Sequence, residues 1–247
     1  MTNRPLRFID PSGHSEACGE ETGLLCKHAD STLADFGINT SGLNNKQKWS
    51  IAAAAAASGL KFFRTYGTSR GFDSPEDAFK KLHGDIFIIA DPSRIDCLTT
   101  NEGSSGSKIA CGKDARNFAA FLHEFGHSMD IHFNQDFSSN LISDNDFEGN
   151  AIDGGYGNPW KRTTDGFICN TLQCLGHPPS LGYPCDGGEM SFCARQEQFA
   201  DLYMNWIFHS MGDPNHGFMG SSAGIYRLVD FGVRLLPLVF NKHLGQP

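Results

Sequence analysis

Residues 115–132 read ARNFAAFLHEFGHSMDIH, and this stretch decides the fold that we expect. The apolar residues recur at helical spacing and Asp114 precedes them as an N-cap residue, so the sequence predicts a helix here. His123 and His127 are four residues apart, which places their side chains on one face, one turn apart. Two imidazoles so placed can share one tetrahedral Zn²⁺, and Glu124 can accept a proton from a water that the zinc activates. The H-E-x-x-H pattern therefore predicts one zinc ion per chain.

The apolar residues of this helix lie largely away from the two histidines; they are Phe118, Phe121, Leu122, Phe125 and Met129. A helix with this pattern is buried by its apolar face and presents the histidines to a cleft. The alternative is a core helix that carries two structural histidines. The motif and the amphipathic pattern together favour the metal site.

The whole chain has 247 residues, of which 39% are hydrophobic and 20 are phenylalanine, so it can bury a substantial core. We expect a single α+β domain over residues 1–247. The polar first 45 residues predict a loop-rich N-terminal segment, and residues 134–190, rich in Gly, Asn, Asp and Pro, predict a long irregular region. Further helices are predicted at about 46–60, at about 195–211 and at about 222–236, where Pro237 would stop or kink the last one. Another helix is predicted to begin at Pro75, with Ser74 as its N-cap. Residues 84–90 predict a buried strand.

The charge balance excludes two classes of partner. There are 28 acidic and 20 basic residues, a net charge of −8, and no basic patch, which disfavours nucleic acids and anionic membranes. The longest apolar run, Ile51–Ala57, is too short to span a bilayer. We expect a monomer that acts on a protein or peptide substrate.

Eight cysteines and no CxxC pair favour disulfides over a zinc ribbon or a thioredoxin-type site. Four disulfides in a secreted protein are expected, with local pairs such as Cys18–Cys26 and Cys97–Cys111, and the last four cysteines pairing among themselves. The alternative is eight buried thiols in a cytosolic protein. Because the first ten residues lack the apolar region of a signal peptide, a secreted form would be a mature one.

A third zinc ligand distinguishes the classes of H-E-x-x-H protein. A metzincin would need Gly and His where this chain has Asp130 and Phe133, and the GTxxD-type segment of an aspzincin is absent. In the predicted helix at 195–211, Glu197 and Asp201 are four residues apart and share a face. An ordinary solvated acidic face would give the same spacing.

The strings HEFGHSMD (123–130) and EQFADLY (197–203) resemble the gluzincin metallopeptidases, and locally they are most similar to the anthrax lethal factor-like branch. The resemblance covers about residues 115–205 and implies a zincin-like catalytic domain. It implies that Glu197 is the third zinc ligand beside the two histidines. It also implies that Asp201 orients a ligand histidine, that Asp130 has a similar supporting role, and that Glu124 is the general base and then the proton donor.

The chain departs from that branch at one position. The family has a tyrosine seven residues before the ligand glutamate to support the oxyanion, and this chain has Met190 there. The candidates for that role are Tyr183, which we take as the catalytic candidate, Tyr156 and His177.

These observations predict a secreted zinc endopeptidase. The zincin class pairs its substrate with an edge strand that precedes the active helix, and residues 84–90 are the candidate, although a core strand would look the same. Two alternatives remain: a zincin-fold binding or effector protein without turnover, and a zinc hydrolase that acts on a non-peptide bond.

Overall fold

The computed structural model describes residues 23–94, 96–103, 106–113, 115, 118–143, 196, 199–200, 202–204, 206–207 and 231–246. Within these residues no helix is long and apolar enough to cross a membrane. The first and last described elements are both helical, and helices and a small sheet make up the rest. The expected α+β class is confirmed.

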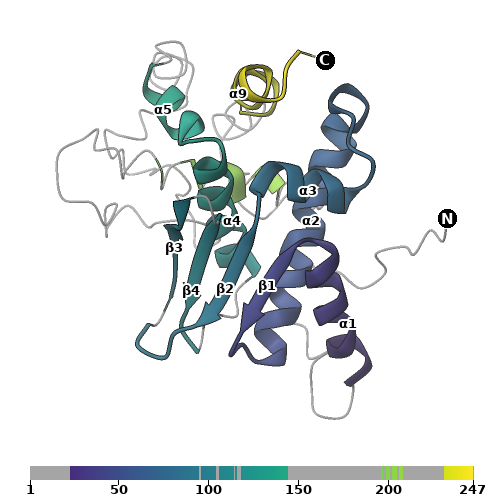
Figure 1. The fold of residues 1–247 in the computed structure, drawn as a ribbon, viewed down its shortest axis with the longest axis vertical. Helices are drawn as coiled ribbons and strands as arrows, with labels where there is room; N and C mark the ends of the chain where they lie inside the picture. Colours follow the sequence, from purple (N-terminus) through teal and green to yellow (C-terminus); the bar gives the residue numbers. More distant parts are fainter. Residues whose placement is uncertain are drawn as a thin grey trace, which may run out of the picture.

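Four strands form one mixed sheet in the order β1-β2-β4-β3 (Figure 1). Strands β1 (Ile38–Ser41), β2 (Ile86–Ala90) and β4 (Ser107–Cys111) run parallel to one another. Strand β3 (Cys97–Asn101) is antiparallel and pairs with β4. In the sheet that the described residues form, β3 is therefore an edge strand and β2 is internal.

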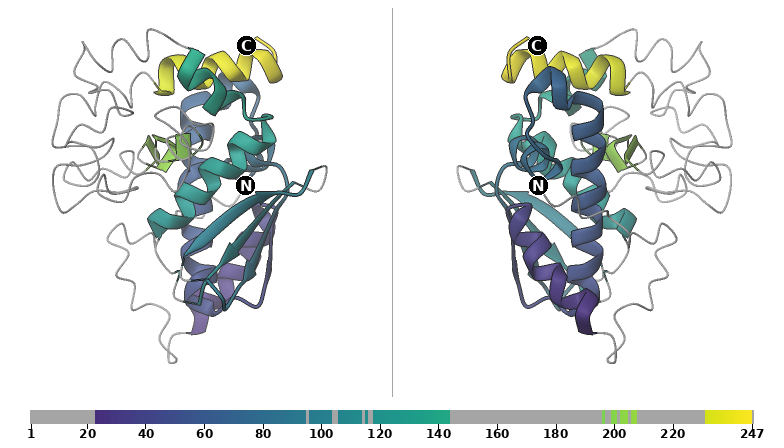
Figure 2. Two further views of the ribbon diagram at one scale, coloured as in Figure 1. Left: turned by 90° about the vertical axis from the view of Figure 1, so that its left-hand side faces the viewer. Right: turned by 90° about the vertical axis from the view of Figure 1, so that its right-hand side faces the viewer.

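The helices pack on one face of this sheet (Figure 2). They are α1 (Gly23–Asp35), α2 (Asn45–Arg70), α3 (Pro75–His83) and α4 (Phe118–His132). Ile88 and Ile109 are fully buried in the core, whereas Phe87 and Leu98 on the other face are 43% and 45% exposed. The alternation of buried and exposed residues along β2 follows the two-residue period of a strand.

Helices α2 and α3 begin at side-chain caps. Asn44 and Gln47 form a reciprocal capping box at the start of α2, and Ser74 accepts a hydrogen bond from the Asp77 amide at the start of α3. The predicted start of α3 is confirmed. Helix α2 runs well past its predicted end at residue 60 and stops at Gly71, whose φ of 64° suits glycine.

The N-terminal prediction is wrong for part of its range. Residues 23–41, expected to be loop-rich, contain α1 and β1. The sequence of α1, GLLCKHADSTLAD, has one short apolar stripe at four-residue spacing, Leu25, Ala29 and Leu33, and Ala29 and Leu33 are buried in the core. Polar residues surround this stripe, so composition alone favours a loop, and packing against α2 stabilises the helix.

Two other boundaries also differ from the sequence-based expectation. Residues 136–143 in the predicted irregular region form α5 (Asp136–Ser143), and the remainder of that region lies outside the described residues. At the C-terminus a π-helical turn, η4 (Phe231–Leu235), leads into α9 (Leu236–His243). Pro237 lies in the first turn of α9, directly after the π-helical turn, so the predicted stop at Pro237 is wrong.

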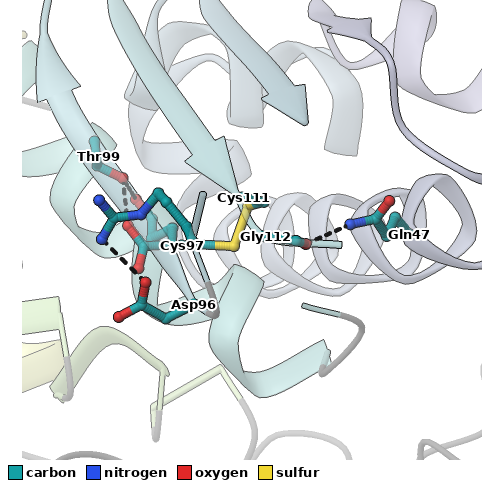
Figure 3. The surroundings of a disulfide bond; sticks show 8 residues. Gln47, Asp96, Cys97, Thr99, Cys111 and Gly112 are labelled. Carbon is teal, nitrogen blue, oxygen red and sulfur yellow. Dashed lines mark hydrogen bonds and ion pairs between the residues drawn. A yellow bond between two sulfur atoms is a disulfide. The ribbon is translucent and has the colours of Figure 1, made fainter. Parts of the chain in front are cut away.

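The predicted Cys97–Cys111 pair is a disulfide (Figure 3). The two cysteines are direct partners in the β3–β4 register, so the Gly- and Ser-rich excursion at 97–111 is a hairpin closed by its own cross-link. The Gln47 side chain donates to the Gly112 carbonyl at 2.9 Å and ties α2 to the chain that leaves β4. The pairing of Cys18–Cys26 and of the last four cysteines lies outside the described residues.

Candidate metal centre

Helix α4 is buried along the face that the sequence predicts. Phe121, Leu122, Phe125 and Met129 have no exposed surface, whereas His123 and His127 are half-buried. The amphipathic interpretation of this helix is confirmed, although the helix begins at Phe118 and its predicted cap, Asp114, lies outside the described residues.

The two histidines converge on one point. Their Nε2 atoms are 3.1 Å apart, and their rings are nearly perpendicular with centroids 4.7 Å apart. Two nitrogens that ligate one tetrahedral zinc at about 2.05 Å would lie about 3.3 Å apart. The pair therefore fits two ligand positions of a zinc ion. Without a metal the same distance suits an N–H···N hydrogen bond between neutral imidazoles.

Glu124, between the histidines in sequence, is buried with 7% of its surface exposed. The Thr99 hydroxyl on β3 donates a hydrogen bond to Glu124 Oε2 at 2.6 Å. A carboxylate so removed from water requires such partners, because burying it unpaired would be costly. Edge strand β3 thus holds the candidate general base, a contact that the sequence did not suggest because it joins residues 25 positions apart.

Asp130 is 1% exposed at the end of α4. The Ser138 amide donates to its Oδ1 at 3.0 Å, which joins α4 to α5, whereas its Oδ2 has no hydrogen-bond partner among the described residues. Burial raises the pKa of this carboxyl, and the bonds from Ser138 and the nearby His127 oppose that rise. The side chain is therefore close enough to His127 to interact with it electrostatically.

The second sequence motif packs directly on α4. The described residues between 196 and 207, which we call the second-motif segment, are all helical, as predicted. Gly126 faces Ala200 so closely that a Cβ at Gly126 would lie 2.7 Å from the Ala200 Cα and 3.2 Å from its Cβ. Only glycine fits there without a shift of the backbone. Gly126, the residue before His127, is therefore a point at which α4 contacts the second-motif segment.

Aromatic side chains fix the second-motif segment on its other sides. Phe199 stacks on Phe137 of α5 with centroids 4.8 Å apart, and Trp206 lies 5.1 Å from Phe62 of α2. Phe199 and Tyr203 have no exposed surface, and Trp206 is 6% exposed. The second-motif segment therefore has a buried apolar side made of aromatic residues.

A buried polar chain anchors the same segment. His83 Nδ1 donates to the Phe79 carbonyl at 2.8 Å, since a carbonyl can only accept. Burial lowers the pKa of His83 to about 3, so its Nε2 is an acceptor and receives the Tyr203 hydroxyl hydrogen at 2.8 Å. The Tyr203 oxygen in turn bonds the Ser58 hydroxyl. The chain connects α2, α3 and the second-motif segment.

The structure thus brings the His123 and His127 side chains together, while the Glu124 carboxylate is held by Thr99. No group of three or more metal-ligating side chains occurs among the described residues. The predicted third ligand and its partner, Glu197 and Asp201, lie outside those residues. So do the oxyanion candidates Tyr183, Tyr156 and His177.

Comparisons with known proteins do not extend these observations. No family model, no curated protein and no solved structure matches the chain.

Proposed function

We propose that this protein is a secreted, zinc-dependent endopeptidase with a zincin-like catalytic domain. The observation that carries the proposal is the convergence of the His123 and His127 Nε2 atoms, which lie 3.1 Å apart. Structural histidines alone would explain this distance, but they would not explain why Glu124, the residue after His123, is a buried carboxylate held by a hydrogen bond. The Cys97–Cys111 disulfide supports a location outside the reducing cytosol.

Glu197 is the proposed third ligand. The close contact of Gly126 with Ala200 supports it, because Ala200 follows Glu197 by three residues and Gly126 precedes His127 by one. Three residues are nearly one helical turn, so we expect a ligand at this position to be near enough to the histidines to complete the site. Asp201 is the proposed partner of a ligand imidazole, and Asp130, which interacts electrostatically with His127, is a second proposed support.

A zinc ion held by these residues would supply Lewis-acid chemistry, which activates water and polarises a carbonyl group. Glu124 accepts the proton of the attacking water and passes it to the leaving amine. Its low exposure suits this exchange, because bulk water competes little for the carboxylate. We retain Tyr183 as the proposed donor to the developing oxyanion, a role that needs a preorganised hydrogen-bond donor.

Strand β3 is the proposed substrate-binding edge. The sequence-based candidate, residues 84–90, is wrong for this role, because β2 is paired on both sides by β1 and β4 and has no free edge. β3 pairs only with β4 among the described strands and, through Thr99, contacts the residue proposed as general base. An extended peptide added to this edge would lie along the active helix.

Metal content and two variants test the proposal. Purified protein is expected to carry one zinc per chain, and a peptide library with mass-spectrometric site mapping should reveal cleavage. Glu124→Gln should abolish cleavage and retain zinc, whereas Glu102→Gln, the same change at an exposed carboxylate, should leave both unchanged. Glu197→Ala should release zinc.

Each outcome separates the proposal from its alternatives. Zinc without any turnover would favour a binding protein with this fold. Zinc with turnover of esters but no peptide would favour another hydrolase. Protein prepared without chelators that contains no zinc would refute the proposed function, and full zinc retention by Glu197→Ala would refute the third ligand.

A further inference from the structure

Glu124 has a fixed neighbour that no sequence pattern assigns. The Thr99 hydroxyl lies 2.6 Å from Glu124 Oε2 and 3.4 Å from the Glu124 backbone carbonyl. A hydroxyl has one hydrogen to donate, and the shorter contact to a charged acceptor takes it. The hydrogen bond is thus made to the carboxylate whose chemistry the proposed function requires.

The strand that carries Thr99 is itself firmly held. Two residues earlier, Cys97 is cross-linked to Cys111, its direct partner on β4. Immediately before it, the Asp96 carbonyl accepts a 2.8 Å hydrogen bond from the Gly112 amide. Thr99 also stands opposite Ile109, which is fully buried. The hydroxyl therefore has a defined position relative to α4.

We propose that Thr99 is a positioning residue: its hydroxyl fixes the rotation of the Glu124 carboxylate and so the direction in which the second oxygen points. The terminal torsion of a glutamate is broad and would otherwise leave that direction undefined. Proton transfer depends on hydrogen-bond geometry between the base and the water, so a freely rotating carboxylate is a poorer base. This inference rests on the proposed function of Glu124.

The position of Thr99 also couples two parts of the site. It lies on the edge strand proposed to bind the substrate, and its side chain reaches the proposed base on α4. A substrate that pairs with β3 would therefore bind to the same strand that orients Glu124. Both substrate binding and orientation of the base require a rigid strand, and the Cys97–Cys111 disulfide constrains β3.

The chain offers a matched control. Thr65 on α2 is exposed and donates to the Lys61 carbonyl instead of Glu124, away from the strand proposed to bind the substrate. Thr99→Val removes the hydroxyl and keeps the branched shape, Thr99→Ser keeps the hydroxyl, and Thr65→Val makes the same change outside the proposed site.

The effect of these variants is measured by steady-state kinetics on a peptide that the library experiment shows to be cleaved. Thr99→Val should lower kcat about 10- to 100-fold with KM and zinc content unchanged, as expected for a lost hydrogen bond to a charged group. Thr99→Ser should stay within about threefold of the parent protein, and Thr65→Val should match the parent protein. Equal kcat values for Thr99→Val and Thr65→Val in an active enzyme would overturn the proposal and leave the proposed function standing.

A second measurement does not depend on turnover. Thr99→Val, Glu124→Ala and the double variant form a double-mutant cycle, in which urea unfolding of the zinc-free proteins measures the free energy of unfolding. We expect non-additive losses, because either single change removes the same bond. Additive losses would overturn the proposal even if the enzyme is active. If the parent protein neither binds zinc nor cleaves peptides, the proposed function fails, and the cycle still decides whether Thr99 holds Glu124.

Discussion

Replacing Gly126 by alanine is expected to disturb the proposed zinc site without removing any of the proposed ligands. The added Cβ would lie 2.7 Å from the Ala200 Cα and 3.2 Å from the Ala200 carbonyl oxygen. Carbon atoms in good contact are separated by about 3.5–4.0 Å, so one backbone must move by about 1 Å. Metal–ligand distances vary by only about 0.2 Å, so if Glu197 is the third ligand as proposed, a shift of its helix would weaken zinc binding.

The stability change in the zinc-free protein is expected to be small, since two effects oppose each other. Alanine in place of glycine inside α4 favours the helix by about 1 kcal/mol, and overpacking costs about 1–3 kcal/mol. The net loss of unfolding free energy should be about 0–2 kcal/mol. Zinc affinity should fall by at least about tenfold, in the range seen when residues that support metal ligands are changed.

Competition with a chromogenic chelator measures the zinc affinity, and urea unfolding measures the stability. Gly67→Ala is the matched control, because its added Cβ would meet only the side chain of Phe63, at 3.1 Å, which can rotate away. This control should bind zinc like the parent protein. The reasoning is refuted if Gly126→Ala also binds zinc like the parent protein, since the contact with Ala200 would then not determine the site.

Three further predictions concern stability. Replacing both Cys97 and Cys111 by serine should lower the unfolding free energy by about 3 kcal/mol in urea, because the disulfide closes a loop with a sequence separation of 14; unchanged stability would contradict this. Tyr203→Phe should cost about 1–3 kcal/mol in thermal unfolding, since it leaves the buried His83 nitrogen without its donor, and a smaller loss would mean that the chain adapts. The pKa of His83 is about 3 in the folded protein and about 6.5 in the unfolded chain. At a pH between these two values the unfolded chain therefore binds a proton at His83 that the folded protein does not. Stability should fall by about 1.4 kcal/mol per pH unit below pH 6.5, more steeply than in His83→Gln; equal slopes at pH 7 and pH 5 would argue against it.

Local chemistry made part of the fold predictable. Ser74 before Pro75 defines the start of α3 because cap and first-turn preferences act within a few residues. The Cys97–Cys111 pair closes a short hairpin, so its partners are near in sequence. Strand order could not be obtained in this way. The apolar run of β2 fits a core strand or an edge strand, and only the pairing with β1 and β4 decides between them.

In the candidate site too, contacts within one helix could be predicted and contacts between distant segments could not. The spacing of His123 and His127 fixes their convergence because the helix itself sets it. The Thr99 hydroxyl reaches Glu124 only because the β3–β4 hairpin folds back beside α4, and nothing in the residues around Thr99 marks that contact. Predictions from one sequence are therefore strongest for ligands on one helix and weakest for the groups that orient them.

The second-motif segment shows what holds the two halves of the proposed centre together. Four cysteines between 169 and 193 precede Glu197, and the disulfides predicted among them would stiffen the loop that leads to it. The described residues reveal a separate source of order: Ala200 against Gly126 on α4, Trp206 against α2, and the Tyr203 hydroxyl bonded to α3. Three contacts with three helices fix the position and rotation of a short helical segment without reference to the loop that precedes it. Helix packing therefore accounts for the placement of the second motif, and any loop disulfides would add to an arrangement that the core already defines.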